Sequence, residues 1–208
     1  MQTAASAPVT PVRITPDPER VRAAMTGLLL LGAVIGFVGA MLPVWAGRLS
    51  LDLLDAGRCL SALGAGSLVA ALAARKASWD QGPRLRKLFA AGALLCGATL
   101  FCLPLATDPN VLALQLSALG AGGGAVSAAA AGLLRSATTG RRISALLNLA
   151  GVSFGLGAIV SSASVWWLVD LVSWQTLARV CAVGPMIVAV LNWRARVRSC
   201  RRCASERE

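Results

Sequence analysis

Charged side chains inside apolar stretches are the first candidates for chemistry in this sequence, because a charge within a membrane is costly unless it has a use. The centres of the long apolar stretches contain no Asp, Glu, Lys, Arg or His. Asp55 and Arg58 stand near the start of one stretch, three residues apart, which brings two side chains together on a helix. We interpret them as an interfacial ion pair. No side chain is then an evident proton carrier for proton-coupled transport.

The uncharged polar residues of these stretches leave two interpretations open. In the first, Asn148 and Gln115 line a substrate path together with the small residues Gly36, Gly122 and Gly155. In the second, Asn148 forms a hydrogen bond between two helices, which is a common role of an amide in a membrane helix. The second interpretation is the favoured one for Asn148.

Nothing in the sequence resembles a nucleophile beside its base, so we expect no enzyme activity. Four of the six cysteines lie in apolar stretches, where cysteine behaves as a small hydrophobic residue. Cys200 and Cys203 have the spacing of metal ligands, but a structural zinc site needs four ligands and the chain has no histidine. We therefore predict neither a metal site nor a cofactor.

The composition places these residues in a membrane protein. Of the 208 residues 56% are hydrophobic and 14% are charged, against about 25% charged residues in soluble domains. A helix needs about 20 apolar residues to cross a bilayer. The sequence predicts an all-α polytopic protein with an N-terminal tail over 1–22, a membrane domain over 23–195 and a C-terminal tail over 196–208. Its six spans are 25–46, 53–74, 88–105, 111–134, 143–165 and 175–193.

The distribution of the basic residues predicts the orientation of the chain. With six spans, 17 of the 20 Lys and Arg residues fall on the side that holds both termini. Because short cytoplasmic loops are rich in Lys and Arg, we expect both termini in the cytoplasm, in a bacterial inner membrane. The net charge of +11 therefore indicates the lipid bilayer as partner and not nucleic acid. The residues expected to contact anionic lipid headgroups are Arg194, Arg196, Arg198, Arg201 and Arg202.

The stretch Val111–Ser164 is unusually rich in small residues on both sides of a short basic turn. Small residues let helix backbones approach closely in lipid, where no hydrophobic force drives association. We therefore expect the fourth and fifth spans to form one tightly packed helix pair.

Residues 25–195 resemble the N-terminal six-helix half of a major facilitator superfamily transporter. The likeness rests on GLLLLGAVIGFVGAMLPVWAGRLSLDLLDAG in the first span and its exit, and on GAGGGAVSAAAAGLLRSATTGRRISALLNLAGVSFGLGAIVSSAS in the fourth and fifth. LLNLAGVSFGLGA is similar to the sugar-porter branch that includes fucose permease, and Ser173-Trp174 resembles the family's aromatic entry to helix six. The loop AALAARKASWDQGPRLRK lacks the family's Gly and Asp pattern. The helix-four arginine and the helix-five Gly-Pro of antiporters are also missing.

The resemblance implies that this chain corresponds to one half of a transporter. Complete transporters of this family have two such halves, with the substrate near the bilayer midplane between them. A second copy, in a homodimer, or another membrane subunit is then expected to cover the glycine-rich face. Two functions follow: transport of a small uncharged solute, or a non-transporting role as a structural or assembly subunit of a larger membrane complex.

Overall fold

The computed structural model describes residues 18–77, 82–137 and 142–205, and the side chains of 18–75, 84–137 and 143–192. Every regular element in these residues is a helix. Their bounds are α1 Pro18–Leu49, α2 Leu53–Ala77, α3 Gly82–Cys102, the 3₁₀ turn η1 Leu103–Leu105, α4 Pro109–Ala137, α5 Arg142–Leu168 and α6 Trp174–Ser205.

Six of these helices are long and apolar enough to cross a membrane, which confirms the predicted fold class. Each predicted span lies within one helix, the third including the η1 turn. Helix α1 begins at Pro18, within the predicted N-terminal tail, and α6 continues to Ser205, within the predicted C-terminal tail. No Pro or Gly interrupts the segment after the sixth span, and arginine favours helix. Residues 1–17 and the side chains of the five tail arginines lie outside the described residues.

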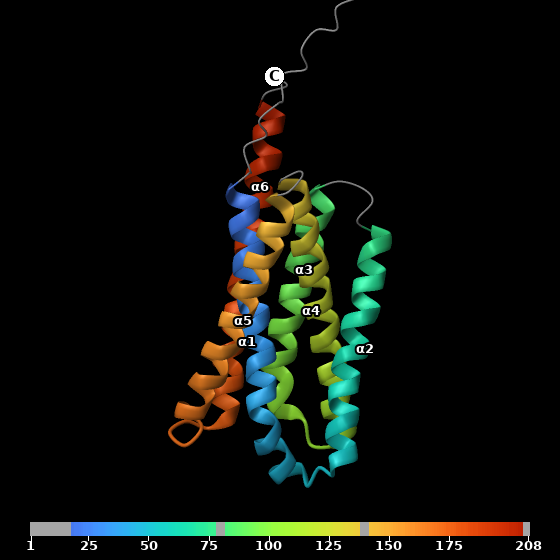
Figure 1. Cartoon of the computed structure of the whole chain (residues 1–208), viewed down its shortest axis with the longest axis vertical. Coiled ribbons are helices and arrows are strands. Elements are labelled where there is room, and N and C mark those ends of the chain that lie inside the picture. The colour runs from blue at the N-terminus through green and yellow to red at the C-terminus, as the bar shows by residue number, and fades with distance from the viewer. Residues whose placement is uncertain (1–17, 78–81, 138–141, 206–208) are drawn as a thin grey trace, which may run out of the picture.

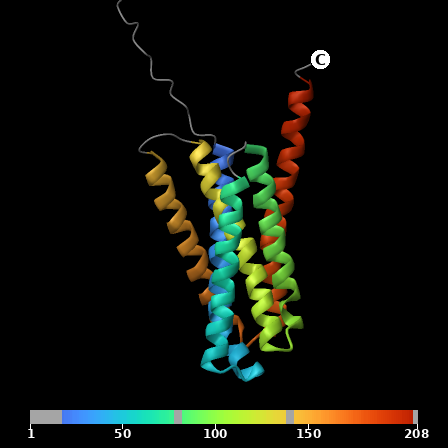
Figure 2. The ribbon, with the colours of Figure 1, turned by 90° about the vertical axis from the view of Figure 1, so that its right-hand side faces the viewer.

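The six helices form a four-helix core with two outer helices. Helices α1, α3, α4 and α6 pack around one another, α2 lies against α4, and α5 lies against α1 (Figure 1). Turning the molecule by 90° places α2 in front of the bundle and α5 at one edge, opposite α6 (Figure 2). Only 11% of the span residues of α2 and of α5 are buried, against 39–50% in the other four spans.

The expectation that the fourth and fifth spans form one tightly packed pair is wrong. Helices α4 and α5 touch only slightly, whereas α4 packs closely on α2 and α5 packs closely on α1. The small residues do produce close helix contacts, as expected, but with helices that are not neighbours in the sequence. The reason is that the glycines of each helix face a different partner, as shown below.

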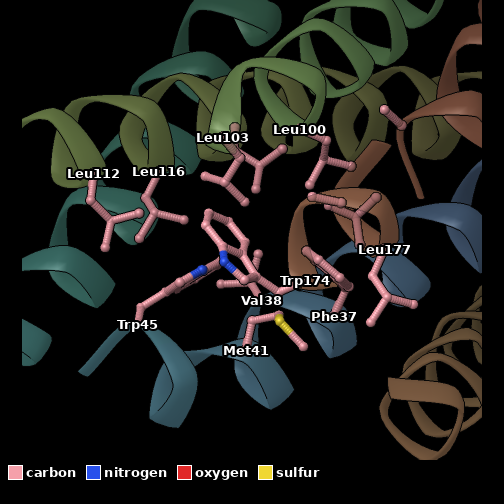
Figure 3. Close-up of a cluster of buried hydrophobic side chains, with 14 of the residues drawn as sticks. Phe37, Val38, Met41, Trp45, Leu100, Leu103, Leu112, Leu116, Trp174 and Leu177 are labelled. Carbon is pink, nitrogen blue, oxygen red and sulfur yellow. The ribbon is translucent and has the colours of Figure 1, made fainter. Parts of the chain in front are cut away.

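Two clusters of buried apolar side chains fill the core. The first lies where α1, α3, η1, α4 and α6 meet and includes Phe37, Met41, Leu100, Leu116 and Trp174 (Figure 3). The second lies nearer the other end of the bundle, around the fully buried ring of Phe89. The clusters hold the four core helices together, which leaves the outer faces of α2 and α5 exposed.

Short connections with defined helix starts join the helices at the end of the bundle opposite the termini (Figure 1). The carbonyls of Asp52, Asp108 and Ser173 accept the first backbone hydrogen bonds of α2, α4 and α6, and Asp and Ser are favoured at this position. Helix α1 ends where Ser50 adopts a left-handed conformation and the Leu51 amide donates to the Ala46 carbonyl. These starts and stops fix the lengths of the helices that carry the candidate residues.

Candidate functional site

A close contact stabilised by glycines joins the outer helix α5 to α1. At Gly32 and Gly36 of α1, an added Cβ would overlap the carbonyl oxygens of Phe154 and Ala158 on α5. At Gly157 of α5, an added Cβ would overlap a carbonyl oxygen of α1. The backbones of the two helices therefore touch directly, which only glycine permits at these positions. The hydroxyl of Ser162 on α5 donates to the Gly36 carbonyl at 3.1 Å.

The outer helix α2 packs on α4 through the same arrangement of glycines. At Gly120 and Gly124 of α4, an added Cβ would overlap the carbonyl oxygens of Leu63 and Ser67 on α2. At Gly66 of α2, an added Cβ would overlap a carbonyl oxygen of α4. The hydroxyl of Ser67 donates to the Gly120 carbonyl at 3.1 Å. Each contact thus combines a Gly-x-x-x-Gly pair on one helix, a glycine on the facing helix, and a hydrogen bond from a serine hydroxyl to a glycine carbonyl.

Each of the two contacts joins a helix from the first three to a helix from the last three. Helix α2 of the first unit, α1–α3, docks on α4, and α5 of the second unit, α4–α6, docks on α1. The first helices of the two units, α1 and α4, touch each other, as do the third helices, α3 and α6. The bundle is therefore built from two three-helix units that exchange their middle helices.

The structure places two of the predicted path glycines inside helix contacts. Gly36 lies in the α1–α5 contact, and Gly122 of α4 faces Gly92 and Cys96 of α3. Both glycines are buried and serve close packing of the helices. They are therefore not positioned to line an open path.

Asn148 and Gly155 lie instead on the open side of α5. The Asn148 side chain is exposed and makes no hydrogen bond within the part of the chain that the structure describes. No interhelical hydrogen bond of Asn148 to a described residue is present, so that interpretation stays a prediction. An added Cβ at Gly155 or at Gly151, one turn earlier, would meet nothing within 4 Å. Asn148, Gly151 and Gly155 therefore form an open patch along α5, with the Asn148 amide as its polar group.

Gln115 lies apart from Asn148, at the contact of α4 with the end of α3. Its Nε2 donates to the Cys102 carbonyl at 3.0 Å, while its Oε1 is buried without a hydrogen bond from any described residue. The side chain satisfies a carbonyl that the end of α3 leaves free. The amide therefore closes the α3–α4 connection, and the structure does not bring it together with Asn148.

Asp55 and Arg58 form a salt bridge near the start of α2, with 3.1 Å between Arg58 Nη1 and Asp55 Oδ1. The Arg58 side chain is 69% exposed and that of Asp55 is 30% exposed. An exposed pair of this kind contributes at most about 1 kcal/mol to the free energy of unfolding. Its position at a helix end agrees with the interfacial interpretation and offers no charge to a path through the bundle.

The described residues contain no group of three or more Cys, Asp or Glu side chains that could hold a metal ion. Cys59 and Cys96 are buried at helix contacts, where Cys96 Sγ lies 3.6 Å from the Leu119 carbonyl. The side chains of Cys200 and Cys203, which have the spacing of metal ligands, lie outside the described residues.

The outer surfaces of α2 and α5 are apolar and carry small residues. On α2, a shallow groove with an open volume of about 950 Å³ runs past Gly57, Ser61 and Ala65, next to the exposed Leu53 and Leu54. On α5, Ile159 and Val160 are more than 60% exposed. Apolar side chains at this exposure suit a surface in contact with lipid or with another membrane helix.

Known proteins supply no further assignment of this site. The chain matches no family model and no curated protein sequence.

Proposed function

We propose that this protein is one half of a facilitator-type transporter, which a second copy of the chain completes, and that it carries a small uncharged solute. The exchange of middle helices between the units α1–α3 and α4–α6 is the observation that supports the proposal. Nested three-helix repeats of inverted topology are a feature of each half of a major facilitator transporter. The sequence resemblance and the helix packing both support this proposal.

The open patch on α5 is the surface that the second copy would face. Asn148 offers an amide donor and an amide acceptor to a hydroxylated solute, and Gly155 leaves room beside it. No acidic or basic side chain of the described residues lies in this middle part of α5. An uncharged polar lining favours an uncharged substrate such as a sugar.

In transport assays, Asn148→Ala should reduce uptake at least about tenfold, because one or two hydrogen bonds to the solute would be lost. Labelled L-fucose and D-glucose are suitable probes, with the purified protein in liposomes. Asn192→Ala is the matched control, since the Asn192 amide donates to the Val188 carbonyl of its own helix at 2.9 Å and should leave uptake unchanged. Normal uptake by Asn148→Ala, or no protein-dependent uptake of any neutral probe, would reject the proposal.

We also propose that both termini face the cytoplasm of a bacterium whose inner membrane holds the protein. The N-terminal end of α1 and the C-terminal end of α6 lie at the same end of the bundle (Figure 1). That end carries most of the basic residues, while Arg48, Arg58 and Arg179 lie at the other. The positive-inside rule then assigns the basic end to the cytoplasm.

Cysteine labelling of intact cells tests this orientation. In a background without native cysteines, Thr107→Cys should react with a membrane-impermeant maleimide, because exposed Thr107 lies in the connection between η1 and α4. Lys87→Cys, at the opposite end, should react only after the cells are opened. The reverse pattern of labelling would contradict the orientation.

A second function, as a non-transporting subunit of a larger membrane complex, is favoured by one observation. The charged side chains of the described spans lie at helix ends, so no coupling residue lies in the bundle. In that case the open faces of α2 and α5 would contact other subunits. Asn148→Ala would then lower the amount of assembled complex without any specific effect on uptake.

A further inference from the structure

A second site lies within the single chain, at the end of the bundle opposite the termini. A cavity of about 310 Å³ opens there between α1, η1 and the start of α6, lined by Trp45, Arg48, Pro104, Trp174 and Gln175 among others. Its volume reaches the lower limit of typical small-molecule sites. It is separate from the open patch on α5, and its polar groups come from α1 and α6.

The two tryptophans of this cavity are buried donors without an acceptor. Trp45 is 2% exposed and Trp174 is 9% exposed, and neither indole Nε1 has a hydrogen-bond partner among the described residues. In the view of Figure 3 their nitrogen atoms point towards each other. An indole nitrogen only donates, so these two groups cannot satisfy one another. A buried donor without an acceptor is costly, and an acceptor placed between the rings would remove that cost twice.

These tryptophans differ from the ones that anchor helices at a membrane surface. Trp166 and Trp167, at the end of α5, are 80% and 77% exposed, as expected of an interfacial aromatic belt. Trp45 and Trp174 instead belong to the first cluster of buried apolar side chains and line the cavity. Interfacial anchoring therefore does not explain the burial of their N–H groups.

Arg48 supplies a positive charge at the cavity. Its guanidinium lies over the Trp174 ring, 5.6 Å from the centroid, at the rim of the cavity. No carboxylate of the described residues forms a salt bridge with Arg48. Asp52, Asp108 and Asp170 lie in the connections of the same end, but none of them lines the cavity. The lining thus combines two indole donors and the Gln175 amide with one positive charge. A guanidinium pairs well with carboxylate or phosphate.

We infer that this cavity binds an oxyanion, a carboxylate or phosphate group whose oxygens accept hydrogen bonds from Trp45 and Trp174 and whose charge pairs with Arg48. The aromatic faces and Pro104 would hold an apolar part of the same molecule. A free organic anion and an anionic lipid headgroup both carry this chemistry. The site does not depend on transport or on a second copy, since one chain supplies all of its groups.

Indole NMR signals of the full-length protein test the site directly. The chain has six tryptophans, and Trp45→Phe and Trp174→Phe assign the two signals of interest in a sample labelled with ¹⁵N-tryptophan. In phosphatidylcholine nanodiscs, benzoate or phenyl phosphate should shift both signals along one saturating curve and leave those of Trp166 and Trp167 unchanged. If the source is lipid, phosphatidylglycerol nanodiscs should produce the shift without any added anion.

Arg48→Gln should weaken the response at least about tenfold, because a hydrogen-bonded charge pair is lost. Arg179→Gln is the matched control, since Arg179 also lies over an aromatic ring, 5.8 Å from the centroid of Phe101, but does not line the cavity. Both variants change exposed side chains, so folding should be unaffected. Unshifted Trp45 and Trp174 signals in all three conditions, or equal responses of the two variants, would overturn the proposal.

Discussion

Gly120→Val should detach α2 from the bundle. The new side chain would have to occupy the position of the Leu63 carbonyl oxygen on α2, so the helices must separate. Overpacking in a core costs about 1–3 kcal/mol, and here backbone and not a flexible side chain blocks the space, so we expect at least about 3 kcal/mol. The Ser67 hydrogen bond to the Gly120 carbonyl would be lost as well. Unfolding of the purified protein in detergent, followed by circular dichroism, measures the change.

Gly64→Val is the matched control for this substitution. Gly64 lies on the outer helix α2 itself, but an added Cβ there would meet nothing within 4 Å. Valine favours helix more than glycine does, so the control should match or slightly exceed the wild-type stability. Equal losses for the two variants would show that the glycine contact between α2 and α4 is not what holds the outer helix.

Gly157→Val should have an equally large effect on the other outer helix. An added Cβ at this position would overlap the Leu29 carbonyl oxygen of α1, and no rotamer change would relieve the overlap. We expect a loss of at least about 3 kcal/mol, with α5 displaced from α1. Limited proteolysis of the α4–α5 connection, together with thermal unfolding in detergent, would report the displacement.

Gly151→Val, on the open side of the same helix, provides the comparison for Gly157→Val. An added Cβ at Gly151 would meet nothing within 4 Å, so stability should not fall. Gly157→Val and Gly120→Val should cause similar losses of stability, because the two contacts are built alike. A large loss at one site and none at the other would contradict the relation between the two three-helix units.

The six helices could be predicted from the sequence because a membrane span depends on local composition. About 20 apolar residues in a row mark a span whatever the tertiary structure. Helix ends are less evident from composition, since α6 continues beyond the apolar segment through a run of arginines to Ser205. Hydropathy locates the membrane-crossing part of a helix but carries no information on where the hydrogen-bonded backbone stops.

Helix partners could not be predicted in the same way. Gly120 and Gly157 both indicate a close contact, but a single sequence does not say which helix approaches each glycine. The simplest assumption is that adjacent spans pack on each other, but α2 packs on α4 and α5 packs on α1. Two of the three Gly-x-x-x-Gly pairs, Gly32 with Gly36 and Gly120 with Gly124, stand in the first helix of each unit and mark these contacts. The third pair, Gly151 with Gly155, has the same spacing but faces no other helix.

The candidate site was predicted only in part. The exposed position of Asn148 on α5 is consistent with a substrate path, whereas Gly36 and Gly122 turn out to be packing residues. The cavity at Trp45 and Trp174 was not predicted at all. The two tryptophans stand 129 positions apart, and in an apolar segment a tryptophan near a helix end indicates an interfacial anchor. Only the packing of α1 against α6 buries their N–H groups.

The mass of the intact protein, released from nanodiscs into a native mass spectrometer, shows whether two copies of the chain associate. If two copies complete the transporter, the dominant species should have twice the chain mass of 21.3 kDa. A dimer of this kind would bury the open faces of α2 and α5 and place Asn148 between the copies. A single chain as the dominant species, or a much heavier assembly with other membrane proteins, would contradict the proposal that this chain is half of a homodimeric transporter.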